Sequence, residues 1–182
     1  MTENNQNVWA EQFIDRLQSL STGDRTALKR SLGIALQEAD AKAWAAFYRV
    51  YLRDNSWDED ACFITACAVS AFHNCGGAAM ELPYRLKEIS ADSAGAENKL
   101  LQLLDIPLKQ NSYFAVKIGR ILRLVLSKGK NVSFTTLLKD LRLWDHPNRF
   151  VQLRWARIFY GNSIEETTKP ENISKENDEH VD

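Results

Sequence analysis

Apolar residues recur at helical spacing along most of this chain of 182 residues. The spacing between Val8 and Leu20 predicts a first helix, and Ser21 or Thr22 can cap a second, shorter helix that contains Leu28. No segment alternates apolar and polar residues with a period of two, and no Asn-Gly or Asp-Gly turn joins two apolar runs. The pattern therefore predicts an all-α fold.

Two longer helices follow in the first half of the chain. Asp40 can cap a helix over residues 41–52, and Ser56 can cap a helix over residues 57–74. The second of these is rich in Ala and Cys and apolar on most faces, so we expect it at the centre of a bundle. The first carries an aromatic stripe, which is typical of a core-facing side: Trp44, Phe47, Tyr48 and Tyr51.

Glycine, proline and small residues interrupt the pattern near the middle of the chain. Gly76 and Gly77 end the fourth helix, and Pro83 with a small-residue run at 90–96 flanks a short helical segment at 84–89. This composition predicts a hinge between two halves of the molecule.

After this hinge, the second half of the chain contains a brief leucine-rich helix and then three further helices. Leucine spacing predicts the brief helix over residues 97–104, and Ser112 and Ser133 can cap helices that end near residues 127 and 144. Pro147 suits a first helical turn, so we expect the last helix to begin there and to end at Tyr160, before Gly161.

The predicted elements group into two helical sub-bundles packed into one elongated body. We expect an N-terminal sub-bundle over residues 8–78 and a basic C-terminal bundle over residues 79–161. Residues 162–182 are acidic, lack aromatic residues and show no period, which predicts a disordered tail. A chain of this length with 45% apolar residues can form a stable core without metals or disulfides.

Charge is distributed unevenly along the chain. Residues 109–160 contain eleven Lys or Arg and two Asp, a net of +9, whereas residues 1–108 and residues 161–182 each carry −5, so the net charge is only −1. A cationic stretch that folds into helices displays its charge on ordered surfaces, which is typical of a protein that binds a polyanion.

The cations of this stretch share helix sides. On a helical wheel Lys117, Arg120, Arg123 and Lys128 lie opposite an apolar side, and in the last helix Arg149, Arg154 and Arg157 do the same. An ordinary solvated face mixes both signs of charge, whereas these helices contain almost no acids. Arginine also favours phosphate, because its guanidinium group can donate to two oxygens and stays charged.

No pattern in the sequence indicates catalysis. The three histidines lack a second ligand at metal spacing, and the common nucleophile, zinc-protease and phosphate-loop motifs are absent. We therefore expect no enzyme activity, metal or other cofactor. Cys62, Cys67 and Cys75 form an odd set without C-x-x-C spacing, so free, buried thiols are favoured over disulfides or a zinc site.

The N-terminal sequence lacks the features of a secretory signal, and no apolar run is long enough to cross a bilayer. We expect a cytoplasmic protein without a membrane partner.

Several segments, taken in order, resemble one known family from about residue 10 to residue 161. The segments are Gly23-Asp24-Arg25-Thr26-Ala27-Leu28-Lys29-Arg30; Ala46-Phe47-Tyr48-Arg49 with Trp57; Glu97-Asn98-Lys99-Leu100-Leu101 with Leu103-Leu104; Gly119-Arg120-Ile121-Leu122-Arg123-Leu124 with Lys128-Gly129; Val132-Ser133-Phe134 with Leu137-Leu138-Lys139-Asp140-Leu141 and Trp144; and Val151-Gln152-Leu153-Arg154-Trp155-Ala156-Arg157-Ile158-Phe159-Tyr160. Their order, spacing and end point resemble the CasB family, the small subunit of the type I-E CRISPR surveillance complex Cascade.

The resemblance implies a non-catalytic, all-helical subunit, present as two copies in a crRNA-guided complex. Its implied partners are the backbone and large subunits, crRNA, the displaced strand of target DNA and a second copy of itself. The family's basic positions correspond to Arg120 with Arg123, to Arg154 with Arg157, to Arg25, Lys29 and Arg30, and to Arg85. Together with the helix faces above, the predicted nucleic-acid-binding residues are Arg25, Lys29, Arg30, Arg85, Lys117, Arg120, Arg123, Lys128, Arg142, Arg149, Arg154 and Arg157.

Three positions depart from the family pattern. Leu82-Pro83-Tyr84-Arg85 replaces a Ser-Leu-Gly-Arg segment, Gly119 stands where a second arginine is common, and Phe134 stands where tryptophan is usual. The last change keeps an aromatic anchor.

Two other functions fit the charge pattern. A helical transcription regulator could use a helix-turn-helix over residues 134–160, with Asn148 and Gln152 as its few base-reading side chains. Alternatively, a protein-interaction module could present the basic face to an acidic partner.

Overall fold

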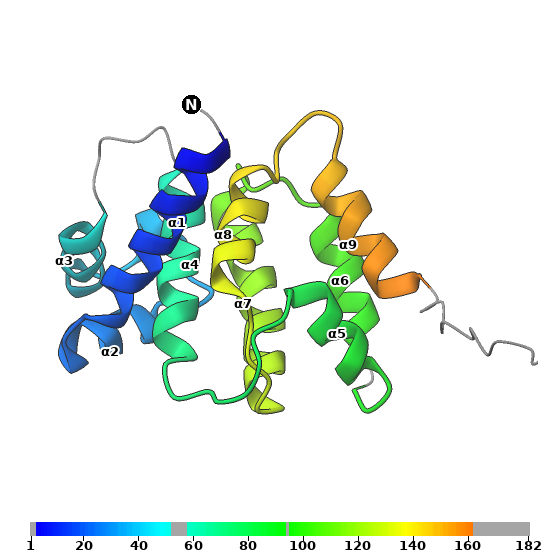
Figure 1. Cartoon of the computed structure of the whole chain (residues 1–182), viewed down its shortest axis with the longest axis horizontal. Coiled ribbons are helices and arrows are strands. Elements are labelled where there is room, and N and C mark those ends of the chain that lie inside the picture. The colour runs from blue at the N-terminus through cyan, green and yellow to red at the C-terminus, as the bar shows by residue number, and fades with distance from the viewer. Residues whose placement is uncertain (1–2, 52–57, 94, 162–182) are drawn as a thin grey trace, which may run out of the picture.

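The structure, a computed structural model, describes residues 3–51, 58–93 and 95–161. Within these ranges the chain forms nine α-helices and one 3-10 helix, and the only β-type pairing is an isolated bridge between Met80 and Val132 (Figure 1). The predicted all-α fold is confirmed. The helices are α1 (Glu3–Gln18), α2 (Thr22–Arg30), η1 (Leu36–Glu38), α3 (Ala41–Val50), α4 (Glu59–Ala71), α5 (Leu82–Ser90), α6 (Ala96–Leu104), α7 (Asn111–Ser127), α8 (Phe134–Arg142) and α9 (Phe150–Tyr160).

The helices form an elongated body. Figure 1 shows α1 to α4 at one end, α7 and α8 in the middle, and α5, α6 and α9 at the other end. Helix α4 packs against α1, α2, α7 and α8, while α5 packs against α6, α7 and α9. One buried apolar cluster extends from Trp9 to Phe159, and the division into sub-bundles at residue 78 stays a prediction.

Helix α4 occupies the centre of the first end, as its composition predicts. Every residue from Ala61 to Ala71 is buried. Alanine and cysteine side chains are small, so four neighbouring helices can approach this one closely. Cys62 and Cys67 are free thiols in this core, which confirms their role as small apolar residues, and burial raises the pKa of both. Cys75 is also a free thiol, but it lies beyond the end of α4 and is only partly buried, which corrects the expectation that all three are buried.

Three predicted N-cap positions, Ser21, Asp40 and Ser133, are confirmed, although Ser133 makes no capping hydrogen bond with its side chain, and one prediction is wrong. The Ser21 hydroxyl accepts from the Asp24 amide at 3.1 Å, and the Asp40 carboxylate accepts from the Ala43 amide at 2.8 Å. Ser112 lies inside α7, which begins one residue earlier at Asn111. Ser56, the predicted cap of the fourth helix, lies outside the described residues, and Asp58 caps α4 instead.

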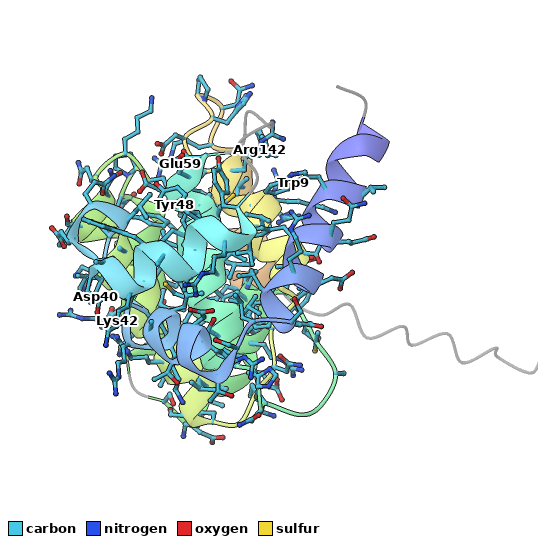
Figure 2. The ribbon with its side chains drawn as sticks, turned by 90° about the vertical axis from the view of Figure 1, so that its left-hand side faces the viewer. Trp9, Asp40, Lys42, Tyr48, Glu59 and Arg142 are labelled. Carbon is cyan, nitrogen blue, oxygen red and sulfur yellow. The ribbon has the colours of Figure 1, made fainter. Side chains whose placement is uncertain are left out.

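The aromatic stripe of α3 is only half buried, which corrects the expectation that all of it faces the core. Phe47 and Tyr51 are buried, but Trp44 and Tyr48 are exposed. The polar atoms of the exposed pair explain their position. Trp44 Nε1 donates to the Leu36 carbonyl at 2.6 Å, and the Tyr48 hydroxyl lies 3.3 Å from the Glu59 carboxylate at the start of α4 (Figure 2).

The last helix begins later than predicted. Arg149 adopts a left-handed backbone conformation, with φ 50°, and α9 starts at Phe150. Pro147 therefore lies in the preceding turn. The Arg149 side chain stabilises this turn, because its Nη2 donates to the Leu104 carbonyl at 2.7 Å.

Two glycines allow α7 to cross the turn after α2 at close range. Gly33 has a φ of 85°, a conformation that favours glycine. A Cβ on Gly119 would lie 2.9 Å from the Gly33 backbone nitrogen and closer still to its Cα. The departure from the family pattern at Gly119 therefore has a structural cause: this crossing leaves no room for a side chain.

Gly161 is the last residue that the structure describes, and its carbonyl accepts from Lys87 Nζ of α5. The predicted acidic tail over residues 162–182 lies outside the described residues. Within the described part of the chain, none of the helices has the length and apolar character that a bilayer crossing requires.

Candidate nucleic-acid interface

The predicted cations divide into those whose side chains bond to other parts of the chain and those that have no such partner among the described residues. Arg123 of α7 belongs to the first class. Its Nη2 donates to the Leu32 carbonyl at the end of α2, and its guanidinium group lies 3.2 Å from where a Cβ on Gly33 would be. This contact fixes the crossing of α7 over the turn after α2.

Arg154 links α9 to α8 through a buried carboxylate. The Asp140 side chain, 5% exposed, accepts from Arg154 Nη2 and from the indole Nε1 of Trp155 at 2.7 Å. Glu81 is a second, weaker partner of Arg154 at 3.8 Å. Burial raises the pKa of Asp140, although the hydrogen bond from Trp155 and the charge of Arg154 oppose that rise.

Arg85 and Arg149 are also engaged by backbone carbonyls. Arg85 of α5 is buried, and it donates to the Asn131 carbonyl at 2.9 Å and to the Ala78 carbonyl. Arg149 donates to the Leu104 carbonyl and also forms an ion pair with Asp105 at 3.3 Å. The nucleic-acid role of these four arginines stays a prediction, but their positions are explained by the fold.

Lys117 and Arg142 also contact other side chains. Lys117 Nζ donates to Gln102 Oε1 at 2.7 Å and lies 5.0 Å from the ring centroid of Tyr113. Arg142, at the end of α8, is half-buried. Its charge lowers the pKa of Cys62, although burial of the thiol raises that pKa by more. It therefore lies near α4, on the side that also holds Glu59 and Tyr48 (Figure 2).

Another group of predicted cations has no hydrogen bond or ion pair within the described part of the chain, and each is exposed. Its members are Lys29, Arg30, Arg120, Lys128 and Arg157. Since exposed cations without carboxylate partners keep their charge available, these five are the strongest candidates for phosphate contacts.

Three of these five, Lys29, Arg120 and Lys128, belong to α2 and to α7 with its C-cap, two segments that approach each other at two places. Gly33 contacts Gly119 at the first place. Arg25, Lys29 and Gly129 line one pocket at the second. We call these two segments, with the turn that follows α2, the α2–α7 seam, and the predicted cations that we assign to it are Arg25, Lys29, Arg120, Arg123 and Lys128.

Arg30 and Arg157 are not assigned to the seam. Arg30 lines a groove between α2 and α3 with Asp40 and Lys42, which Figure 2 labels side by side. Arg157 is on α9, at the far end of the body in Figure 1. The helix wheels predicted that cations share a side within each helix, but the structure distributes them over at least two regions.

Sequence reasoning overlooked Tyr113, one turn before Lys117 on α7. Its side chain is 53% exposed. Tyr113, Lys117 and Arg120 are spaced four and three residues apart, so they follow one another along the same helix side. An exposed aromatic ring at that spacing from two cations is the signal that could have identified it, because rings of this kind stack with bases.

No group of three or more His, Cys, Asp or Glu side chains that could hold a metal ion occurs among the described residues.

The sequence matches a family model described as CRISPR-associated protein Cse2 over residues 24–160. A curated relative, CRISPR-associated protein Cse2 of Thermus thermophilus, is 27% identical over 171 residues, which cover 90% of this chain and 96% of the relative.

Solved structures share the fold. A crystal structure of a Cse2-family protein, also from Thermus thermophilus, is 26% identical, with a TM-score of 0.70, over 89% of this chain and all of that one. A chain from a structure described as a CRISPR RNA-guided surveillance complex is 20% identical, with a TM-score of 0.66, over 85% of this chain and 92% of that one. At that identity the second likeness shows the fold alone.

Proposed function

Because this chain belongs to the Cse2 family of CRISPR-associated proteins, we propose that it is a non-catalytic subunit of a crRNA-guided, type I-E surveillance complex, Cascade. In this role it binds the backbone of nucleic acid and stabilises the R-loop and the displaced DNA strand. Its partners are the backbone and large subunits, crRNA, target DNA and a second copy of itself. The shared fold of a chain in a CRISPR RNA-guided surveillance complex supports this assignment.

The observation that carries the nucleic-acid part of the proposal is the α2–α7 seam. Lys29, Arg120 and Lys128 project from two helices without a carboxylate partner in the described part of the chain. Through carbonyl bonds, Arg123 fixes α7 to the turn after α2, and Arg25 fixes α2 to the end of α1. Free cations on such fixed segments attract a phosphate backbone without reading its sequence.

Such cations can stabilise an R-loop without any covalent step. The heteroduplex that forms is about as stable as the DNA duplex that it replaces, so strand exchange is close to balanced. Protein contacts with the freed strand then favour the open state, and they lengthen its lifetime rather than catalyse a reaction.

We place the protein in the cytoplasm. Cys62, Cys67 and Cys75 are free thiols, which fits a reducing compartment.

The charge proposal predicts a strong salt dependence. If four to six phosphates are contacted, the logarithm of affinity for a single strand should fall with the logarithm of salt concentration at a slope of roughly −3 to −4. Replacing Arg120 and Lys128 together with glutamine removes two contacts, so the slope should become shallower by about 1.4. The measurement is target-DNA affinity and R-loop lifetime of the assembled complex over a salt series.

A matched control exists for this double variant. The side chains of Lys42 and Lys109 are also exposed and unpaired within the described residues, and they lie outside the seam. Their double glutamine variant changes the net charge equally and should leave both slope and lifetime close to wild type. If both double variants weaken DNA binding equally, the effect comes from net charge and not from the seam. If neither variant weakens DNA binding, the seam has no role in it.

The helix-turn-helix alternative has less support. Gln152, one of its two base-reading candidates, is 7% exposed and donates to the Trp144 carbonyl at 2.6 Å. The outer side of α9 carries Phe150 and Leu153, which offer no hydrogen bonds to base edges.

A further inference from the structure

The outer side of α9 is an exposed apolar face that contains one unpaired cation. At about 100° per residue, four exposed residues fall within an arc of about 80° on α9. They are Phe150, Leu153, Arg157 and Tyr160, and we call them the outer α9 face. Leu153 is 53% exposed, and Arg157 has no hydrogen bond or ion pair within the described part of the chain.

The neighbouring helices hold the two flanks of α9 and leave its outer face uncovered. On one flank Arg154 lies 3.8 Å from Glu81, which precedes α5. On the other flank the Tyr160 hydroxyl donates to Glu97 of α6 at 3.2 Å. The outer α9 face lies between these contacts, and contiguous exposed apolar side chains of this kind usually mark a contact surface.

The described chain ends at the edge of this face. Gly161 follows α9 directly, and its carbonyl accepts from Lys87 Nζ of α5, so the point where the chain leaves α9 is held against the body. Figure 1 places the end of α9 at the same end of the body as α5 and α6. Whatever follows Gly161 therefore starts next to the outer α9 face.

The acidic tail carries the charge that complements the rest of the chain. Residues 162–182 contain seven Asp or Glu and two Lys, whereas residues 1–160 carry a net charge of +4. Because the tail is attached to α9, it meets the outer α9 face at an effective concentration on the order of millimolar. This attachment favours the tail over a separate partner as the occupant of the face.

The first residues of the tail suit the face in type and in reach. Ile164 is followed by Glu165 and Glu166, so an apolar side chain and two carboxylates come three to five residues after Gly161. An extended chain covers about 3.3–3.6 Å per residue, and Arg157 lies only about 6 Å back along α9. The two carboxylates therefore reach Arg157 even when a turn uses two residues.

The carboxyl end of α9 does not oppose this pairing. Free carbonyls at a helix end repel acids, but the effect falls off within the last turn. Helical side chains lean toward the N-terminus of their helix, so the charge of Arg157 lies toward Leu153 and away from those carbonyls.

We propose that the acidic tail folds back onto the outer α9 face, with Glu165 and Glu166 beside Arg157. Ile164 then packs on the apolar side chains of the face. A phosphate backbone would use the same cation, so the docked tail competes with nucleic acid at this end of the body. The competition rests on the proposed function, whereas the docking does not.

The first experiment uses the full-length chain without nucleic acid and follows the backbone amide signals of Leu153 and Arg157 by NMR. Replacing Glu165 and Glu166 together with glutamine should shift both signals, because the ion pair is lost. Ile164→Ser, which leaves the charge unchanged, should shift them in the same direction.

A matched control lies further along the tail. Asp178→Asn with Glu179→Gln removes the same charge and should leave the signals of Leu153 and Arg157 in place. Equal shifts in this control and in the Glu165 and Glu166 variant would assign the effect to net charge and overturn the docking. Signals that respond to none of the tail variants would also overturn it, and the face would then be free for another subunit.

The second experiment measures the affinity of full-length chains for a single-stranded oligothymidine at low salt. A surface ion pair shifts an equilibrium by up to about fivefold, so the Glu165 and Glu166 variant should bind about two- to fivefold more tightly than wild type. The gain should disappear in an Arg157→Gln background and persist with Lys42→Gln, which removes an exposed cation of α3. No gain over wild type, or equal gains in both backgrounds, overturns the competition.

The two proposals fail in different ways. If the tail variants shift the signals of the outer α9 face but the seam variant of Arg120 and Lys128 leaves DNA binding unchanged, the proposed function fails and the docking stands. If the seam variant weakens DNA binding while those signals do not respond to the tail variants, the docking fails and the proposed function stands.

Discussion

Replacing Asp140 with alanine is expected to lower the free energy of unfolding by about 2–4 kcal/mol. The carboxylate is the common acceptor for Arg154 and for the indole nitrogen of Trp155, and it is itself buried. Its removal leaves the buried indole donor without a partner and separates α9 from α8. Chemical denaturation of the purified chain, followed by helical circular dichroism, measures the loss.

Asp140→Asn is the informative control. The amide keeps an oxygen for Trp155 but loses the charge opposite Arg154, so a smaller loss is expected than for alanine. If the alanine variant unfolds within about 0.5 kcal/mol of wild type, the shared acceptor does not hold α8 and α9 together.

Wild type and Asp140→Asn should also differ in how their stability depends on pH. Burial raises the pKa of Asp140 in the folded state above its value in the unfolded chain, about 3.9. The folded state therefore binds this proton more tightly, and the associated stability is fully present below the unfolded pKa and is lost as pH rises through the folded pKa. Relative to Asp140→Asn, wild type should lose stability as pH rises from about 4. An opposite trend would mean that Arg154 and Trp155 outweigh burial.

Replacing Gly119 with alanine is expected to cost about 1–3 kcal/mol, the range for overpacking in a well-packed interior. In an exposed helix the same change usually stabilises by about 1 kcal/mol, because glycine is a poor helix former. Here the new methyl group meets the Gly33 backbone, which has no flexible side chain to move aside. Arginine at this position, which the family pattern commonly carries, should be tolerated still less.

Gly23 gives a control of opposite sign. It lies in α2, and the nearest atom to a Cβ built there is Ser21 Oγ at 3.9 Å. Gly23→Ala should therefore raise the melting temperature slightly, whereas Gly119→Ala lowers it. Two shifts in the same direction would contradict the role of the Gly33–Gly119 contact.

Local sequence determined most of the fold. The periodicity of α7 and the small residues of α4 identify a charged surface helix and a buried central helix, because each property depends on residues three or four apart. The boundary of α9 could not be predicted in this way. It depends on the left-handed conformation of Arg149 and on the Leu104 carbonyl, which is 45 residues away in the chain.

The sequence predicted the positive charge of the candidate site. It could not predict which of the cations are unpaired and which bond to other parts of the chain. Arg120 and Arg123 look equivalent on a helical wheel, yet only Arg123 reaches a carbonyl in the turn after α2. Likewise Arg154 and Arg157 share a helix side, and only Arg154 meets the buried Asp140. Since those acceptors come from distant segments, the spacing of basic residues alone cannot separate a structural arginine from one available to a ligand.

The central position of α4 also affects how the chain is made. Two of its packing partners, α1 and α2, precede it, whereas α7 and α8 follow it, and α8 ends at Arg142. At typical translation rates the ribosome needs roughly 4–14 s to synthesise the residues between the end of α4 and the end of α8. Until α7 and α8 have been synthesised, the side of the nascent α4 that they cover lacks its partners, so the first half would depend on a chaperone, or on rapid elongation, to avoid aggregation.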